Sequence, residues 1–408
     1  MAKALFLGLP LHGHTNPSLP LVRALVERGD EVVYFSSEAF AASIQQAGAR
    51  YRPYRNAFLA DLGQLSERTD KISWVLMRTT GEVLANELHA FRAESPDYVI
   101  SDSVAPWGQW VGQLLGVPVV TSVTTFAVNR RVLAFAASRG TRPKSVRLVL
   151  SKIRHVAKAA LLGRRLRREY GVRGTGIMGL TFGSSDLNIV YTSRHFQPCA
   201  ETFDDRFLFI GPSIGSRTET AGFLWDDAWQ ADVIYVSLGT LFNAEPAFYR
   251  TCFEAFGGQN VRVVMSIGTT TTEAKLGTPP PNIVVKPWVP QLEVLRRASV
   301  FVSHGGMNSV SESLYHGVPL VVVPQMGEQE IVARQVEALG AGLCLAKNEA
   351  TADRLREAVH RVRADAKFRE RAALVRKSFD AAGGAARGAD AILGFTGRRA
   401  PGVARAIH

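Results

Sequence analysis

His304, a pair of glycines and several polar side chains follow an apolar run in FVSHGGMNSVSESLYHGVPLVVVP, residues 301–324. The apolar run predicts a buried strand, and the residues after it predict the start of a helix. A helix N-terminus presents unpaired N–H groups and a partial positive charge, so it favours anionic oxygen. Gly306 would let a phosphate approach the backbone, and His304, Asn308 and Ser309 can donate hydrogen bonds. The segment therefore predicts a cradle for a nucleotide diphosphate, although by spacing alone a glycine turn with helix-capping residues fits as well.

Further residues of this half could bind the rest of a nucleotide sugar. Glu312, in the predicted helix, could accept hydrogen bonds from two vicinal hydroxyls, as a ribose offers. Trp288 lies at a predicted strand end and could stack on a nucleobase, although a lone tryptophan of this kind is more often part of a core. Gln291 could contact the ribose or the base. Glu328 and Gln329 follow another strand and could bind sugar hydroxyls as acceptor and donor.

A glycine turn in YVSLGT, residues 235–240, ends another predicted strand. Gly239 and Thr240 could approach the phosphates from this turn. A tight connection between a strand and a helix explains the same residues equally well.

Two histidines lie in LPLHGHTNP, residues 9–17, between a predicted strand and a helix expected to begin near Asn16. The imidazole of His14 could take a proton from a hydroxyl, since its unperturbed pKa lies close to the operating pH. A base of this kind is usually held in one tautomer by a carboxylate, and Asp102, at the end of the strand VISD, is the candidate. A loop or capping histidine is the alternative. His12 completes a His-x-His pair, but no third ligand cluster is visible, so we interpret His12 as an acceptor-pocket wall or loop residue.

Alternating strands and helices must position both clusters. Apolar strands are predicted in KALFLGLP, DEVVYFSS, DYVISD, VPVVTSV, VIYVSLGT, VRVVMSIG, NIVVKPW, SVFVSHGG and VPLVVVPQ. Their alternation with helices indicates parallel sheets covered on both faces, in an α/β protein. We predict two doubly wound, Rossmann-like domains that face each other across a cleft. The predicted N-terminal domain spans 1–210, the linker 211–222 and the C-terminal domain 223–374. A helix and tail at 375–408 could pack back on the N-terminal domain.

Length and composition indicate a soluble globular enzyme. The chain has 408 residues, of which 46% are hydrophobic and 21% charged, and this size favours two domains. Cys199, Cys252 and Cys344 show neither a CxxC pair nor a metal-ligand spacing, which fits a reducing cytoplasm and a role as core residues. We expect no signal peptide and no membrane span, because no stretch approaches ~18 uninterrupted apolar residues.

The net charge of +12 is concentrated in one segment. Between Arg139 and Arg173, twelve Lys or Arg residues stand against Glu169 alone. A local basic segment without interleaved aromatic residues is a weak signal for nucleic acid, and we predict no such partner. Apolar residues recur within it at roughly the helical period, so the helix could lie on an anionic membrane surface. A solvated helix face is the alternative interpretation.

The ordered pattern WVPQLEVL…FVSHGGMNSVSESLYHGVPLVVVP…EQ closely resembles the donor-binding signature of the UDP-glycosyltransferase superfamily. The chain as a whole is similar to the bacterial macrolide-glycosyltransferase branch, which has the GT-B fold. LFLGLPLHGHTNPSLPLVRAL resembles the family's opening, and PDYVISD resembles the strand that carries its orienting acid. The resemblance covers nearly the whole chain and is most specific in the C-terminal signature.

This resemblance implies a role for each matching residue. His14 would be the general base and Asp102 its partner. The donor contacts would be Trp288 on uracil, Gln291 and Glu312 on ribose, His304, Asn308 and Ser309 on pyrophosphate, and Glu328 and Gln329 on the hexose. Many relatives have Asp where this chain has Glu328, which could alter sugar preference. Met307 replaces the tryptophan of plant members, as is common in bacterial ones.

The expected activity is inverting transfer of a hexose, with glucose from UDP-glucose favoured, to a hydroxyl of a macrolide, polyketide or polyphenol. No two aspartates have the Asp-x-Asp spacing that holds a metal in the other major glycosyltransferase fold, so we expect no metal and no cofactor. Apolar residues of two variable segments suggest an acceptor pocket, although each could be ordinary packing: Phe58, Trp74, Met77, Phe126, Phe135 and Met178. Alternatives are a membrane-surface enzyme for a lipid or carotenoid, or a silent sugar-nucleotide-binding partner. The sequence leaves monomer and dimer open.

Overall fold

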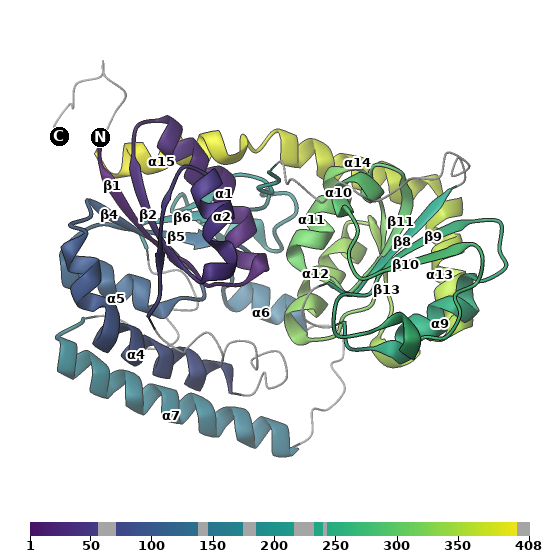
Figure 1. Cartoon of the computed structure of the whole chain (residues 1–408), viewed down its shortest axis with the longest axis horizontal. Coiled ribbons are helices and arrows are strands. Elements are labelled where there is room, and N and C mark those ends of the chain that lie inside the picture. The colour runs from purple at the N-terminus through teal and green to yellow at the C-terminus, as the bar shows by residue number, and fades with distance from the viewer. Residues whose placement is uncertain (56–70, 138–145, 174–184, 216–231, 240–242, 398–408) are drawn as a thin grey trace. The chain divides into compact units, whose positions relative to one another are not determined.

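A computed structural model of the chain describes residues 1–55, 71–137, 146–173, 185–215, 232–239 and 243–397. The chain divides into two compact units, which are described one at a time (Figure 1). Unit 1 consists of Met1–Ser193, Cys199–Gly215 and Ala382–His408, and unit 2 of Arg194–Pro198 and Ser216–Ala381. The chain passes from unit 1 to unit 2 after Gly215, within the predicted linker. The part of that linker after Gly215 lies outside the described residues.

Unit 1 is built on a seven-stranded parallel sheet in the order β3-β2-β1-β4-β5-β6-β7. Its strands are β1 (Lys3–Leu7), β2 (Glu31–Ser36), β3 (Arg50–Pro53), β4 (Tyr98–Asp102), β5 (Val119–Val123), β6 (Leu187–Val190) and β7 (Phe207–Phe209). Its helices are α1 (His12–Glu27), α2 (Ala41–Gln46), α4 (Ile72–Ala93), α5 (Pro106–Leu115), α6 (Arg130–Ala137), α7 (Val146–Tyr170) and α15 (Gly384–Phe395). Single 3₁₀ turns lie at Glu38–Phe40 and Ala200–Thr202.

Helices cover both faces of this sheet. Successive side chains of each strand point to opposite faces, so each face has its own core. Ala4 and Phe6 of β1 pack with apolar residues of α1, α2 and α15. Leu5 and Leu7 pack in the other direction, with residues of α4, α5 and α7. The strands therefore have the continuous apolar character on which their prediction rested.

Unit 2 repeats the plan with a six-stranded parallel sheet in the order β10-β9-β8-β11-β12-β13. Its strands are β8 (Val233–Ser237), β9 (Arg262–Ser266), β10 (Ile283–Lys286), β11 (Ala298–Ser303), β12 (Leu320–Val322) and β13 (Gly342–Cys344). Its helices are α9 (Pro246–Phe256), α10 (Gln291–Leu295), α11 (Met307–Tyr315), α12 (Gly327–Ala338), α13 (Ala352–Ala364) and α14 (Ala366–Asp380). Glu273–Lys275 and Lys347–Glu349 form 3₁₀ turns.

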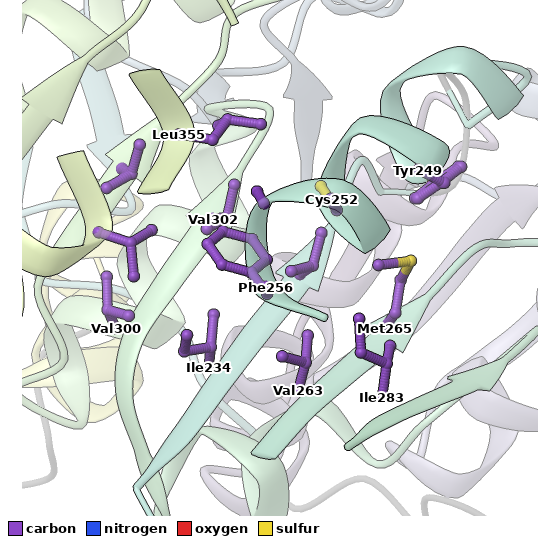
Figure 2. Close-up of a cluster of buried hydrophobic side chains, with 14 of the residues drawn as sticks. Ile234, Tyr249, Cys252, Phe256, Val263, Met265, Ile283, Val300, Val302 and Leu355 are labelled. Carbon is purple, nitrogen blue, oxygen red and sulfur yellow. The ribbon is translucent and has the colours of Figure 1, made fainter. Parts of the chain in front are cut away.

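The core of unit 2 lies between this sheet and helices α9 and α13. Figure 2 shows Cys252 and Phe256 of α9 and Leu355 of α13 above Ile234, Val263 and other strand residues. Cys252 is fully buried, which confirms it as a core residue, whereas Cys199 and Cys344 are half-buried free thiols. Within the described ranges, no helix is both long enough and apolar enough to cross a membrane.

Each sheet has a topological switch point, where strand order reverses and the connections leave in opposite directions. It lies between β1 and β4 in unit 1 and between β8 and β11 in unit 2. In such sheets, ligands bind outside the carboxyl ends of the strands at this point. The two predicted Rossmann-like domains are confirmed, and their topology assigns one candidate site to each unit.

The structure also corrects the predicted elements. Helix α1 begins at His12 rather than near Asn16, since the N–H groups of His14 and Thr15 both donate to the carbonyl of Leu11. Pro17 and Pro20 lie inside the helix, where each lacks the N–H that would donate to the carbonyl four residues earlier. Strands β3, β6, β7 and β13 were not predicted, because they are short and, in β3, largely exposed.

Candidate active site

His14 and Asp102 meet at the switch point of unit 1. His14 lies in the first turn of α1, directly beyond β1, and Asp102 is the last residue of β4, the neighbouring strand. Nδ1 of His14 is 2.9 Å from Oδ2 of Asp102, and the other carboxylate oxygen accepts a hydrogen bond from the N–H of Val104 at 2.8 Å. The histidine side chain is 15% exposed and the aspartate is buried. A proton on Nδ1 that faces the carboxylate places the basic lone pair on Nε2.

Thr124 is a third member of this site that sequence reasoning missed. It follows β5, which pairs with β4, and its hydroxyl oxygen is 3.0 Å from Nδ1 of His14. The hydroxyl can share the Nδ1 proton as a second acceptor, so two groups hold the ring at the same nitrogen. The available signal was a small polar residue at the carboxyl end of the strand beside the one that carries Asp102.

Three buried tyrosines lie within electrostatic reach of the Asp102 carboxylate. Burial raises the pKa of Tyr34, Tyr54 and Tyr191 well above the ordinary value, and the negative charge of Asp102 raises it further. All three phenols are hydrogen-bonded: Tyr34 with Ser18 at 2.9 Å, Tyr54 to the carbonyl of Gly8 at 3.2 Å, and Tyr191 from Ser122 at 3.1 Å. A carboxylate in so apolar a setting interacts strongly with any positive charge that forms on His14.

The predicted acceptor residues are scattered over unit 1. His12 is exposed and makes an edge contact with Phe40, with ring centroids 4.9 Å apart. Phe126 is buried, and Trp74 and Phe135 are half-buried. Met77 is buried, and its side chain faces Gly163 of α7, so it packs α4 on α7. Phe58 and Met178 lie outside the described residues.

In unit 2, Gln291 and Glu312 form a fixed pair. Gln291 begins α10, and its amide nitrogen donates to the buried carboxylate of Glu312 in α11 at 2.6 Å. Tyr235 of β8 donates to the amide oxygen of Gln291 at 3.0 Å. Trp288, just after β10, is 53% exposed, so its indole is not part of the core and offers an open face.

His304 follows β11 at the switch point of unit 2, and its environment is the reverse of that of His14. The side chain is buried, which lowers its pKa to about 4, against a smaller opposing effect of a hydrogen bond with the backbone of Ser237. Its Nδ1 is buried without a hydrogen-bond partner among the residues that the structure describes. The imidazole is therefore uncharged near neutral pH and holds a polar atom that a ligand could satisfy.

The glycines around His304 make room for its ring. A Cβ on Gly306 would lie 2.4 Å from Nε2, and one on Gly239 would lie 2.6 Å from Cε1. Gly239 also has a φ of 76°, in the left-handed region. The sequence assigned these glycines to the close approach of a phosphate, whereas the structure shows that they first accommodate a side chain. Thr240 lies outside the described residues.

The remaining predicted donor residues lie in the first turns of two helices. Asn308 and Ser309 are half-buried at the start of α11, and Met307 before them is buried in the core. Glu328 is exposed at the start of α12. Gln329 beside it is buried, and its Oε1 accepts from the N–H of Gln325 at 2.8 Å. Gln329 uses one lone pair of its amide oxygen in this contact, and its amide N–H groups could donate to a ligand.

No three His, Cys, Asp or Glu side chains of the described ranges are grouped so that they could hold a metal ion.

Residues 252–384 match the family described as Erythromycin biosynthesis protein CIII-like, C-terminal domain. NDP-glycosyltransferase YjiC of Bacillus subtilis is 36% identical, over 95% of this chain and 96% of its own length. Demethyllactenocin mycarosyltransferase of Streptomyces fradiae is 32% identical, over 97% and 87%. The crystal structure of CalG4, the calicheamicin glycosyltransferase, superposes with a TM-score of 0.78 at 31% identity, over 98% of this chain and 100% of its own.

Proposed function

This chain belongs to the family of NDP- and macrolide glycosyltransferases with the GT-B fold, and from that premise we propose an inverting, metal-independent O-glycosyltransferase with His14 as general base. The donor is UDP-glucose, and the acceptor is a hydroxyl of an apolar small molecule such as a macrolide, polyketide or polyphenol. The observation that carries the proposal is the His14–Asp102 pair at the carboxyl ends of adjacent strands.

Acceptor activation is the role of unit 1. Nε2 of His14 takes the proton of the acceptor hydroxyl as its oxygen attacks the anomeric carbon of the sugar. Asp102 stabilises the imidazolium that forms, and Thr124 helps to keep the ring in position. Attack from the face opposite the nucleotide converts an α-linked donor into a β-glycoside. His12, Trp74, Phe126 and Phe135 are assigned to the acceptor side.

Donor binding is the role of unit 2. The exposed indole of Trp288 stacks on the base, and the carboxylate of Glu312, held by Gln291, binds the ribose. The N-terminus of α11, with Asn308 and Ser309, receives the diphosphate. His304 supplies a neutral hydrogen-bond donor there, because burial keeps it uncharged. These groups also offset the charge that develops on the leaving nucleotide diphosphate.

Glu328 and Gln329 favour a fully hydroxylated sugar. An exposed carboxylate accepts hydrogen bonds from hydroxyls, and the amide of Gln329 has N–H groups to donate. A deoxysugar would leave part of this set unused, which is why glucose is proposed although one relative is named a mycarosyltransferase. A silent binding protein would have no use for the complete pair of His14 and Asp102.

Mass spectrometry of overnight reactions with UDP-glucose tests the proposal. Macrolides, flavonoids and lipids serve as acceptors, without added metal and with EDTA in a parallel series. The expected product gains one hexose, is unaffected by EDTA and is lost in His14→Ala. His89→Ala is the matched control, since that histidine is exposed on α4 and has no assigned role in the reaction. Product from His14→Ala but not from His12→Ala would overturn the assignment of the base. The same assay is run with thymidine-linked deoxysugars in place of UDP-glucose. A product from these donors alone would overturn the assignment of the donor.

A further inference from the structure

Helix α7 has one buried face and one exposed face. The buried face packs on α4: Ala159 and Leu166 belong to the core of unit 1, and a Cβ on Gly163 would lie 3.3 Å from the sulfur of Met77. Figure 1 shows α7 running beside α4 on the side away from the sheet. The opposite face of α7 is covered by none of the described elements.

Aliphatic side chains form a stripe on the exposed face. Ile153, Val156 and Leu161 are 60%, 47% and 64% exposed. Val156 and Leu161 follow Ile153 by three and eight residues, so they lie on either side of Ile153, each within about 80° of it around the helix. Single exposed aliphatic residues are ordinary on protein surfaces, but three on neighbouring turns of one helix mark an interaction site.

Basic side chains flank this stripe. Arg154, Lys158 and Arg165 are exposed along one side of the aliphatic stripe. Arg164 and Arg168 are exposed in line with the stripe, toward the C-terminal end of α7. The helix has eight Lys or Arg residues against Glu169 alone, a net charge of +7 in a chain of +12. The structure gives these five exposed basic residues no ion pair within its described ranges.

We propose that this surface docks on an anionic lipid bilayer; it is called the α7 outer face and consists of Ile153, Arg154, Val156, Lys158, Leu161, Arg164, Arg165 and Arg168. A helix with an aliphatic stripe and basic borders lies in the membrane interface, with the aliphatic groups at the boundary of headgroups and acyl chains. The basic side chains reach the lipid phosphates, and their long stems stay against the apolar layer.

The chemistry of the α7 outer face favours lipid over nucleic acid. A nucleic acid would pair with the basic residues and leave the aliphatic stripe in water, and the face has no aromatic side chain on which a base could stack. A lipid bilayer offers phosphates to the basic residues and an apolar layer to the aliphatic stripe. The consequence for catalysis, which depends on the proposed function, is that unit 1 would meet acceptors dissolved in the membrane.

Vesicle co-sedimentation tests the docking without any use of activity. The protein is mixed with vesicles of phosphatidylcholine alone or with a third of phosphatidylglycerol, at low and physiological salt. We expect binding to the anionic vesicles only. A basic residue near the surface contributes about fivefold in partition, so Arg154→Gln/Lys158→Gln/Arg165→Gln should lose about a hundredfold. Ile153→Ser/Val156→Ser/Leu161→Ser should lose at least tenfold and all binding that persists at physiological salt.

The matched control removes three positive charges elsewhere. Arg361, Lys367 and Lys377 are exposed on α13 and α14, and replacing all three with Gln should change partition less than twofold. Equal losses in this control would show attraction by net charge alone and overturn the proposal. So would an aliphatic triple variant that binds normally, or heparin binding that equals vesicle binding and ignores the aliphatic residues. Unchanged thermal unfolding shows that each variant is folded, as expected for exposed positions.

Discussion

His14 and His304 both lie beyond strands that border a switch point, yet their surroundings are opposite. Each histidine follows a central strand at a switch point, His14 after β1 and His304 after β11. His14 is partly exposed and contacts a carboxylate and a hydroxyl. His304 is enclosed by two glycines, and burial lowers its pKa to about 4.

The difference follows from what each ring must do in the proposed reaction. A general base gains a positive charge, so it needs a charged partner and a path to the acceptor. A ring that only donates a hydrogen bond to a diphosphate must keep one charge state and one position, which burial and close packing ensure. The same fold therefore gives one histidine a carboxylate partner and encloses the other between glycines.

The largest expected effect removes the charge beside His14. Asp102→Asn keeps the shape of the site but cannot stabilise an imidazolium, and its amide can favour the wrong tautomer. We expect kcat to fall by about 10³-fold, within the range for general-base catalysis, with donor affinity unchanged. Steady-state kinetics and calorimetry with UDP measure both quantities.

Asp390→Asn is the control for this substitution. Asp390 forms an exposed ion pair with Arg28 at the far end of α1, so activity should stay within twofold. A loss of less than tenfold in Asp102→Asn would show that His14 does not need the carboxylate, and the contrast between the two histidines would collapse.

The expectations from sequence were most accurate where side chains are constrained on both faces. Buried strands such as β1 and β11 are continuous apolar runs, and their polar ends correctly placed Asp102 at the end of a strand and His304 directly after one. Edge strand β3, with the sequence RYRP, is largely exposed and has no such run. The contact between Thr124 and His14 joins residues 110 positions apart, which no local pattern reveals. The packing of the His304 ring against Gly239 likewise joins residues 65 positions apart.

The second effect disturbs the packing of His304. Gly306→Ala places a methyl group 2.4 Å from Nε2, so the ring or the start of α11 must move. Overpacking of this kind costs about 1–3 kcal/mol of unfolding free energy, and the displaced ring should weaken UDP binding by about 10-fold or more. Calorimetry and thermal unfolding test this, with Gly394→Ala as control because a Cβ there meets nothing within 4 Å. Normal UDP affinity in Gly306→Ala would show that the enclosure of His304 does not serve the donor.

A smaller effect concerns the second contact of His14. Thr124→Val keeps the β-branched shape but removes the hydroxyl, and one hydrogen bond is worth about 0.5–1.5 kcal/mol. We expect kcat to fall about 3- to 10-fold with the donor KM unchanged, and Thr124→Ser to restore most of it. Equal losses in Val and Ser variants would indicate that packing, rather than the hydroxyl, matters at this position.

The last effect is the contribution of His304 to the pH dependence of stability. The unfolded chain binds a proton on this histidine near pH 6.5, whereas the folded chain does so only near pH 4. The unfolded state therefore binds more protons between these values, and stability falls as the pH is lowered. From pH 7 to pH 5 the wild type should lose about 2 kcal/mol more than His304→Gln, which does not titrate. Urea unfolding at both pH values measures this difference. Equal losses in the two proteins would mean that the His304 ring takes up its proton in the folded state, and that its charge is not fixed.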